Sequence, residues 1–377
     1  MPPFSCPSCS SCLKLITTLK PIGIIIVTYQ SERHIALLLG SVAATIEPSR
    51  SEVWIWDNAS TDATVEVIER EGKALQLSLH LTRGERNLGF ARANNEAYAA
   101  LQKKTPCETV VLLNPDTVVH AGWWEPLLAE LENPAVGTVA PLLLLPDGTI
   151  NSRGNGLHFL GLGFVQGYGE DASPLPEKIA LFSGSGAALA FRAATLEALN
   201  TRLGMAGIFW EELFLYAEDT DLGWRMRLAG WENRLVPASR VTHDHQFWLR
   251  PLDEPGERLF WIGRNRYLLM LANFKWPTLL VLLPWIAASE VALSLGLWNL
   301  YPLRLRIWRS VWKEAWTDGF WTRRRLLQAG RSVSDRDILR EMTGSIRHGA
   351  LPFRAVNRWL DAGLRLSHLF LCFIVRW

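Results

Sequence analysis

The sequence predicts an α/β domain followed by a helical region. Strand-like apolar runs alternate with helix-periodic segments from residue 21 onward, and alternation of this kind is typical of a mostly parallel sheet flanked by helices. A length of 377 residues suits two folded units, and 49% hydrophobic with 20% charged residues excludes disorder over most of the chain. The net charge of +2 argues against a nucleic-acid partner.

The elements follow one another in a regular order. Ile22–Val27 is a continuous β-branched run of the kind buried on both faces of a parallel sheet. Residues 58–62 supply turn and N-cap chemistry for the helix that follows them. We expect strands at 22–27, 52–56, 77–81 and 109–113, and helices at 35–46, 63–71 and 90–102.

The pattern loosens after Gly148. The glycine-rich stretch 154–169 predicts a mobile loop, and the apolar segment 182–191 is interrupted by Gly184 and Gly186. Residues 209–228 are acidic and aromatic, with a helical pattern in their second half.

Charge and tryptophan divide the chain near residue 247. Residues 1–247 hold 19 basic and 27 acidic side chains, whereas residues 248–377 hold 20 basic and 10 acidic ones. Eleven of the 18 tryptophans lie in the second part, and tryptophan with arginine is typical of a membrane interface. We therefore predict a flexible tail at 1–20, an α/β domain at 21–247 and a helical, membrane-associating region at 248–377.

Three features of the last region favour an anionic membrane surface. Residues 278–303 carry a single charge, but Pro284 and Glu290 weaken a transmembrane reading. Trp308, Trp312 and Trp316 follow at helical spacing with arginines between them, and 323–325 is a triple-arginine cluster. Monotopic attachment is favoured over a single span, and the alternative is a helical subdomain packed on the first domain.

The tail carries Cys6, Cys9 and Cys12, which lack a fourth nearby metal ligand, so an unstructured leader is the favoured interpretation. Its apolar stretch is too short for a signal peptide, which predicts a location on the cytoplasmic face of the cell membrane. The oligomeric state is left open.

Polar side chains follow three of the predicted strands. They are Thr28 and Tyr29, Asp57 and Asn58, and Asn114 and Asp116. Ligands of open parallel sheets bind beyond these strand ends. The first turn lacks the glycines of a dinucleotide site, and the chain has neither a Walker-type phosphate loop nor a Gly-x-Ser-x-Gly elbow.

Five ordered motifs resemble glycosyltransferase family 2, in particular its rhamnosyltransferase-like branch of bacterial surface-polysaccharide synthesis. They are Val27-Thr-Tyr, Asp57-Asn-Ala-Ser-Thr-Asp62, Arg86-Asn-Leu-Gly-Phe-Ala-Arg-Ala-Asn-Asn95, Asn114-Pro-Asp116 and Glu218-Asp-Thr-Asp-Leu222. The resemblance covers residues 21–245. It implies a GT-A fold, a nucleotide-diphosphate sugar donor, Mg²⁺ or Mn²⁺, and inversion at the anomeric carbon.

The resemblance also implies roles for donor-binding residues. Asp57, beside Asn58, can accept a base N–H, while Arg86, Asn87 and Gly89 open a helix whose N-terminus suits a diphosphate. Asn94 and Asn95 would orient the sugar or the loop, and Gly184 would let backbone approach the sugar. Asn114 and Asp116 occupy the place of the metal motif, so Asp116 would supply the carboxylate.

Two further groups complete the implied site. His243 stands where relatives place a metal-contacting histidine, and it fits better than His245. Asp219 would take the proton of the acceptor hydroxyl, with Glu218 as its neighbour, because adjacent carboxylates raise one another's proton affinity. Asp221 would cap or support the helix.

The predicted function is an inverting transfer of a sugar, rhamnose or similar, from a dTDP- or UDP-linked donor to a lipid-linked saccharide. The alternatives are a catalytically silent nucleotide-sugar-binding scaffold and a sugar-phosphate nucleotidyltransferase. The second would need an arginine-bearing glycine loop after the first strand, which the sequence lacks.

Overall fold

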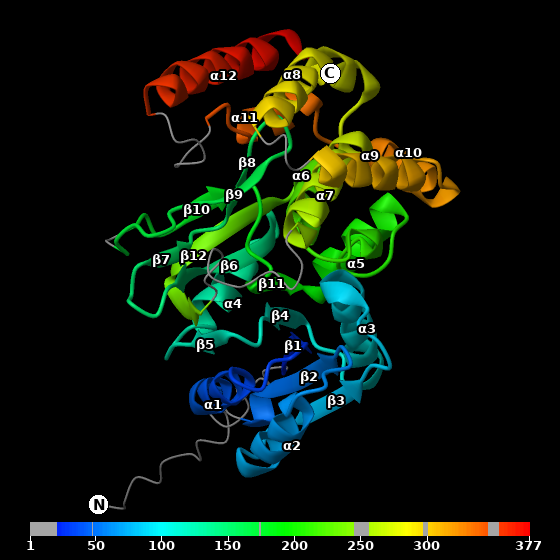
Figure 1. The fold of residues 1–377 in the computed structure, drawn as a ribbon. Coiled ribbons are helices and arrows are strands. Elements are labelled where there is room, and N and C mark those ends of the chain that lie inside the picture. Colours follow the sequence, from blue (N-terminus) through cyan, green and yellow to red (C-terminus); the bar gives the residue numbers. More distant parts are fainter. Residues whose placement is uncertain (1–20, 47, 173–174, 245–255, 297–300, 346–353) are drawn as a thin grey trace, which may run out of the picture.

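The computed structural model describes residues 21–46, 48–172, 175–244, 256–296, 301–345 and 354–377. Cys6, Cys9, Cys12, His245 and the predicted boundary at 247 lie outside these residues. One large sheet runs through the molecule in the order β10-β12-β6-β11-β4-β1-β2-β3, with β5 paired to β12 and β7 to β6 (Figure 1).

The first half of the sheet is parallel, as predicted. Its strands are β3 (Leu79–Arg83), β2 (Ser51–Asp57), β1 (Ile22–Thr28) and β4 (Thr109–Leu113). The connecting helices are α1 (Ile35–Thr45), α2 (Thr64–Ala74) and α3 (Gly89–Lys104). Ile24 packs with α1 and α2 while its neighbour Ile25 packs with α3, because successive side chains of a strand point to opposite faces. The continuous apolar run is thereby buried on both faces.

The second half of the sheet mixes directions. β11 (Ala188–Arg192) runs antiparallel between β4 and β6 (Val136–Leu144), and β12 (Glu232–His243) runs parallel to β6. The remaining strands are β5 (Thr117–Val119), β7 (Ile150–Ser152) and β10 (Ile179–Leu181), and the helices here are α4 (Glu125–Leu131), α5 (Ala193–Leu203) and α6 (Glu218–Leu228). The helix predicted in the second half of 209–228 is therefore confirmed.

The glycine-rich stretch is ordered, so the predicted mobile loop was wrong. β8 (Asn155–Leu157) and β9 (Gly163–Val165) form an antiparallel two-stranded sheet. Gly156 leaves room for the ring of Phe164, since a Cβ there would lie 2.3 Å from that ring. Gly156 therefore serves close packing between the two strands.

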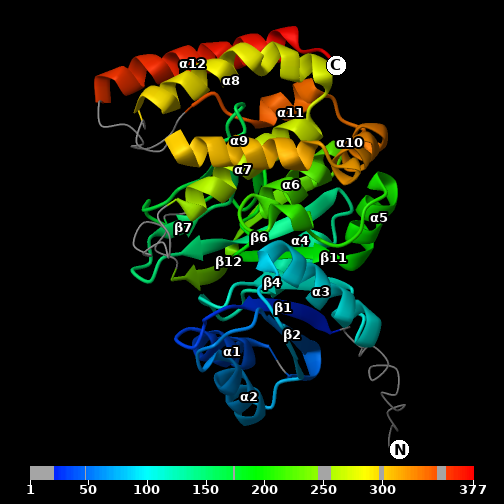
Figure 2. The same cartoon turned by 45° about the vertical axis from the view of Figure 1, so that its right-hand side comes forward.

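The C-terminal region is helical, as expected, and packs on the same face of the sheet as α3. Its helices are α7 (Glu257–Asn273), α8 (Trp276–Gly296), α9 (Tyr301–Ala315), α10 (Asp318–Gly330), α11 (Asp335–Glu341) and α12 (Arg354–Ile374). Leu268 of α7, Leu282 of α8 and Leu327 of α10 belong to one apolar core with Ile25 of β1. Figure 2 shows α8 and α12 at the end of the molecule opposite β1–β3. Among the residues that the structure describes, no helix combines the length and apolarity that crossing a bilayer requires.

Two sequence-based features of this region were misread. Trp308 stacks on Tyr267 of α7 with ring centroids 4.6 Å apart, so it is not part of an exposed stripe with Trp312 and Trp316. Arg323 binds Asp221 of α6, and Arg324 donates to the carbonyl oxygen of Phe274 at 2.8 Å. Both guanidinium groups therefore face the interior, and the triple-arginine cluster does not form a basic surface.

Candidate functional site

The ends of three parallel strands meet at one edge of the sheet. Thr28 of β1 lies opposite Asp57 of β2, and Ile26 lies opposite Leu113, which directly precedes Asn114. β11 begins at the same edge because Ala188 pairs with Leu113. The predicted polar residues are thus brought together by the register of the sheet.

Asp57 organises the first part of this edge. Its Oδ1 accepts from the hydroxyls of Thr28 at 2.8 Å and Ser60 at 2.6 Å, and its Oδ2 accepts from the Ser60 N–H at 2.8 Å. Tyr29, which follows Thr28 in the chain, is half exposed. The Asp57 carboxylate therefore fixes the turn between β2 and α2, and its side chain is almost fully buried.

Asn58 holds the entrance to α3 against β2. Its Oδ1 accepts from the N–H of Leu88 at 3.1 Å, and its Nδ2 donates to the carbonyl of Gly89 at 3.3 Å. Asn87 accepts from the N–H of Gly89 at 2.8 Å, while the Arg86 side chain is exposed beside this helix start. A helix N-terminus with an exposed arginine just before it is a favourable binding place for an anion.

Gly89 is required at this corner. Its φ is +80°, and a Cβ would lie 2.4 Å from the ring of Phe214. Phe90, one residue on, donates its N–H to the Phe214 carbonyl at 2.8 Å. The start of α3 is thus fastened to the loop that precedes α6.

Asp219 lies where several segments converge. Its Oδ2 accepts from the N–H of Gly186 and from Nδ2 of Asn155, both at 2.9 Å, and its Oδ1 accepts from the Thr220 N–H at 2.6 Å. Ala187, next to Gly186, accepts from the N–H of Asn114 at 2.9 Å, which joins this centre to the end of β4. Burial raises the pKa of Asp219 above its ordinary value although these donors oppose the shift.

The three carboxylates at the start of α6 differ in environment. Burial and then the charges of Asp219 and Asp221 raise the pKa of Glu218 well above its ordinary value, and the buried Oε2 of Glu218 accepts no hydrogen bond. Burial would also raise the pKa of Asp221, but the guanidinium groups of Arg323 and Arg225, at 2.8 and 2.7 Å, hold it low. Asp221 thus supports the helix through its ion pairs. Glu218 and Asp219, at the start of the helix, are the carboxyls whose pKa values are raised.

The loop before α6 is strained. Phe214, Tyr216 and Ala217 all have positive φ values, between 61° and 67°, and such conformations cluster at functional sites. Asn265 of α7 is fully buried and donates to the carbonyls of Leu213, Leu215 and Tyr216 at 2.8–3.0 Å. A single amide from the C-terminal region therefore holds the loop in place.

Asp116 and His243 form a second centre. β5 follows Asp116 and pairs antiparallel with the end of β12, where His243 lies opposite Thr117. The His243 Nε2 is 3.3 Å from the Asp116 Oδ1, and its Nδ1 is 3.2 Å from the Oδ1 of Asn151. Both side chains of the pair are more than nine-tenths buried.

The comparison with protein families identifies the first part of this fold. Residues 23–195 match the sequence profile described as glycosyl transferase family 2. These residues are a family 2 glycosyltransferase domain. A relative from Mycobacterium tuberculosis, N-acetylglucosaminyl-diphospho-decaprenol L-rhamnosyltransferase, is 29% identical over 243 residues, which cover 58% of this chain and 75% of that protein.

Solved structures confirm the predicted GT-A fold. Staphylococcus aureus TarS 1–349 in complex with UDP-GlcNAc aligns with a TM-score of 0.51 at 16% identity, over 92% of this chain and 90% of that chain. GalNAc-T7 with UDP, GalNAc and Mn²⁺ aligns with a TM-score of 0.53 at 16% identity, over 69% of this chain and 49% of that chain. The helical C-terminal region is included in the longer alignment.

Asp116 and His243 lie close enough together to fit a divalent cation. Asp116 and His243 offer a carboxylate oxygen and an imidazole nitrogen 3.3 Å apart, whereas two ligands about 2.1 Å from one ion at a right angle lie about 3.0 Å apart. The amide Oδ1 of Asn114 is buried and accepts no hydrogen bond. Within the described ranges no group of three or more His, Cys, Asp or Glu side chains gathers, and Mg²⁺ in proteins typically keeps several water ligands.

Three predicted donor-binding residues contact protein atoms of the domain. Asn95 binds the backbone of Ile208 and Phe209 through both ends of its amide, at 2.8–2.9 Å, and Asn94 donates to the Phe90 carbonyl at 2.9 Å. Of the two roles expected for Asn95, these contacts correspond to orienting the loop. A Cβ at Gly184 would lie 2.4 Å from Leu189, so packing accounts for this glycine.

Sequence reasoning missed three residues that shape the site: Asn155, Asn265 and Arg323. Asn155 lies in the stretch that was interpreted as mobile, and Asn265 and Arg323 lie beyond the family motifs. The amides of Asn155 and Asn265 carry no sequence signal of their own. Arg323 had a signal, since a helical arginine next to aromatic residues also suits an internal ion pair.

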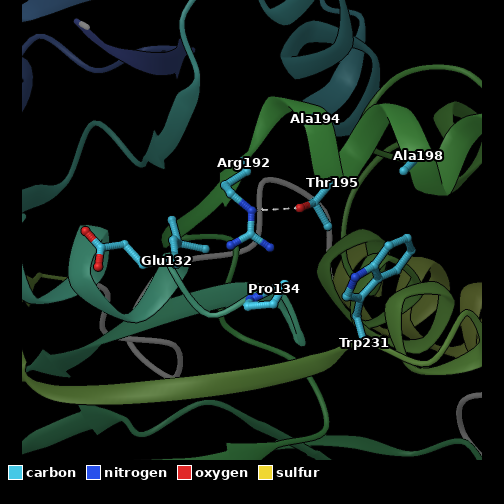
Figure 3. Close-up of a pocket in the computed structure, with 8 residues that line it drawn as sticks. Glu132, Pro134, Arg192, Ala194, Thr195, Ala198 and Trp231 are labelled. Carbon is cyan, nitrogen blue, oxygen red and sulfur yellow. Dashed lines mark hydrogen bonds between the residues drawn. The ribbon is translucent and has the colours of Figure 1, made fainter. Parts of the chain in front are cut away.

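A cavity of about 400 Å³ lies away from these centres (Figure 3). It is lined by Arg192, Thr195 and Trp231, and Arg192 pairs with Thr109 at the opposite end of β4 from Asn114. The Arg192 guanidinium already donates to Thr195 and to the carbonyls of Asn133 and Val136. This cavity therefore lies at the end of β4 opposite the candidate site.

Proposed function

We propose that the chain is an inverting glycosyltransferase that moves a sugar, rhamnose or a similar hexose, from a dTDP- or UDP-linked donor to a lipid-linked saccharide. The observation that carries this proposal is Asp219, a partly buried carboxyl of raised pKa that backbone and side-chain donors hold beside the end of β4. Such a carboxyl suits removal of a proton from a hydroxyl group.

The proposed reaction is a single displacement. The acceptor oxygen attacks the anomeric carbon, its proton passes to Asp219, and the nucleoside diphosphate leaves from the opposite face of the sugar. Glu218 lies next in the chain and keeps the local charge negative when ionised, which raises the proton affinity of the pair. The N–H groups of Gly186 and Thr220 keep the Asp219 carboxylate in one orientation.

The donor would lie along the edge formed by β1, β2 and β4. Asp57 with Thr28 and Asn58 marks the nucleoside end, and Arg86 at the start of α3 would contact the diphosphate. Asp116 and His243 would hold Mg²⁺ or Mn²⁺, which when bound supplies positive charge to the leaving diphosphate. The structures of GalNAc-T7 with UDP and Mn²⁺ and of TarS with UDP-GlcNAc support this placement through their fold alone.

The acceptor and location are inferred from the M. tuberculosis relative, whose name specifies a lipid diphosphate-linked N-acetylglucosamine. An acceptor of this kind lies in a membrane, and the basic, tryptophan-rich C-terminal region suits an anionic membrane surface. We propose that residues 21–247 carry out the transfer and that residues 248–377 bring the enzyme to the cytoplasmic face of the cell membrane.

Calorimetry with Asp116→Ala tests the metal and donor assignment. We expect the variant to fold and to lose Mn²⁺-dependent affinity for dTDP and UDP by at least about tenfold, while Asp171→Asn, an exposed carboxylate on another loop, keeps wild-type affinity. Unchanged, metal-dependent affinity in Asp116→Ala would refute the assignment. Transfer from a panel of nucleotide sugars then identifies the donor.

A further inference from the structure

Helix α12 exposes an apolar face that no other part of the described chain covers. Five of its apolar side chains are each between 53% and 83% accessible to solvent: Trp359, Leu366, Leu369, Phe370 and Phe373. Their spacing places them on one side of the helix. Leu371 on the opposite side of the helix is fully buried, and so is Val375 just beyond the end of the helix. The exposed face therefore points away from the body of the enzyme.

Helix α8 has a similar outward side. Leu279 and Leu282 are buried, whereas Leu280, Leu283 and Val291 are more than half exposed. The ends of the two helices are joined, because the indole N–H of Trp377 donates to the Thr278 hydroxyl at 2.8 Å. Both helices lie at the same end of the molecule in both views (Figures 1 and 2).

Arginines border the apolar face of α12 along one edge. Arg358, Arg365 and Arg376 are exposed. Arg358 and Arg365 are seven positions apart, which keeps them on one side of the helix, and Arg376 lies two residues beyond its end. Arg365 bonds to Asp361 at 2.7 Å, which is the one acidic side chain that the helix offers among its described residues. The rim is therefore positive.

We infer that the outward faces of α8 and α12 seat in the interface of an anionic lipid bilayer, with the arginines among the headgroups. This inference rests on the proposed membrane-bound acceptor and replaces the tryptophan stripe of α9 as the attachment surface. An apolar face bordered by arginine and containing tryptophan and phenylalanine matches the interfacial amphipathic helix. A helix of this kind lies in the plane of the membrane interface, and its attachment to the membrane is reversible.

The charge of the rim argues against a second copy of this chain as the occupant. Two copies that met face to face through α12 would place the arginine rims of both close together, and the described part of the helix has one aspartate to offset them. Anionic headgroups neutralise the same arginines.

Flotation of the full-length protein with lipid vesicles tests the inference. Vesicles of phosphatidylcholine with phosphatidylglycerol should bind the enzyme, pure phosphatidylcholine should bind it more weakly, and added salt should weaken the binding. We expect Leu369→Glu to lower the bound-to-free ratio at least about tenfold. Leu37→Glu on α1 is the matched control, since Leu37 is 63% and Leu369 is 64% exposed.

Equal binding by Leu369→Glu and Leu37→Glu would overturn the inference. So would a lipid-free dimer, seen in sedimentation, that Leu369→Glu dissociates. Arg358→Gln with Arg376→Gln should weaken binding to the anionic vesicles only, and an equal loss on pure phosphatidylcholine would contradict the role of the rim.

Activity assays distinguish a failure of the membrane-attachment inference from a failure of the proposed function. Leu369→Glu should transfer sugar to a water-soluble acceptor as fast as the wild type and more slowly to an acceptor embedded in vesicles. Vesicle binding as expected, without sugar transfer to either acceptor, would refute the proposed function and leave the attachment surface standing.

Discussion

Asp219 and Glu218 are adjacent carboxyls whose pKa values are both raised, for different reasons. Asp219 accepts four hydrogen bonds, and burial still raises its pKa, whereas Glu218 combines burial with the charge of its neighbour. Asp219 is positioned by its partners, and the Oε2 of Glu218 has no protein donor. The first residue suits directed proton transfer and the second suits control of its proton affinity.

Replacing Asp219 with asparagine should separate catalysis from stability. The amide cannot take up the acceptor proton, so we expect turnover per folded molecule to fall by about 10²–10⁴-fold. The new NH₂ would face N–H donors that now bind the carboxylate, which should cost about 1–3 kcal/mol of stability. Donor affinity should persist, and near-normal turnover per folded molecule would assign the base elsewhere.

Replacing Glu218 with glutamine should change how stability depends on pH. Since the folded pKa of Glu218 is raised, the native state keeps a proton that the unfolded state releases, and the free energy of unfolding falls as pH rises above about 4.5. The variant lacks this loss, so its melting temperature should exceed that of the wild type at pH 7 but not near pH 4. Each tenfold difference in proton affinity between the folded and unfolded states corresponds to about 1.4 kcal/mol. Glu85→Gln, at an exposed carboxyl, should show no such difference; an equal response of both variants would contradict the assignment.

At the scale of elements, α6 depends on α10. Asp221 is fully buried between Arg225 of its own helix and Arg323 of α10, and the Arg323 guanidinium also stacks over Trp210 at 4.2 Å. Arg225 donates in addition to the Ile208 carbonyl. This buried network fixes the helix that begins with Glu218 and Asp219.

Arg323→Met should therefore destabilise the whole enzyme. Removal of one partner leaves a buried carboxylate with less compensation, for which about 3–5 kcal/mol is typical. Because Asp221 has a lowered pKa in the fold, its contribution is present above pH 4 and lost as pH falls, and the variant should show a weaker acid dependence. Arg325→Met, at the exposed neighbour two positions on, should melt like the wild type, and equal melting of both variants would refute the network.

Local patterns predicted the first half of the sheet well. The strands β1, β2 and β4 and the helices α1 and α3 follow from short-range periodicity, and the strand ends followed from the parallel order. The sequence did not reveal the β8–β9 pair, because glycines at strand positions resemble a loop until their packing partners are known. Nor could it pair Asp221 with Arg323, which lie 102 residues apart.

At the scale of the molecule, the C-terminal helices complete the core of the first domain. Leu268, Leu282 and Leu327 share a core with β1, and Asn265 braces the strained loop before α6. The predicted region 248–377 is thus joined to the domain by packing as well as by sequence. Detaching it would expose apolar surface and remove Arg323, one of the two guanidinium partners of Asp221.

A chain that ends at Pro277 should consequently fail to fold stably, rather than become a soluble catalytic fragment. We expect aggregation or a melting temperature lowered by more than about 10 °C, because the truncation removes several buried leucines together with Arg323. Thermal melting with size-exclusion chromatography measures this. A monomeric fragment with wild-type melting would show that the helices are an independent unit.

The bond between Asp221 and Arg323 also sets an order of events during synthesis. The ribosome makes Arg323 102 residues after Asp221, which at about 5–20 residues per second is a delay of about 5–20 s. Until then α6 lacks an essential counter-ion, and α8 has already been made. A nascent chain would therefore acquire α8, part of the proposed membrane-facing surface, before the helix that begins with Glu218 and Asp219 is secured.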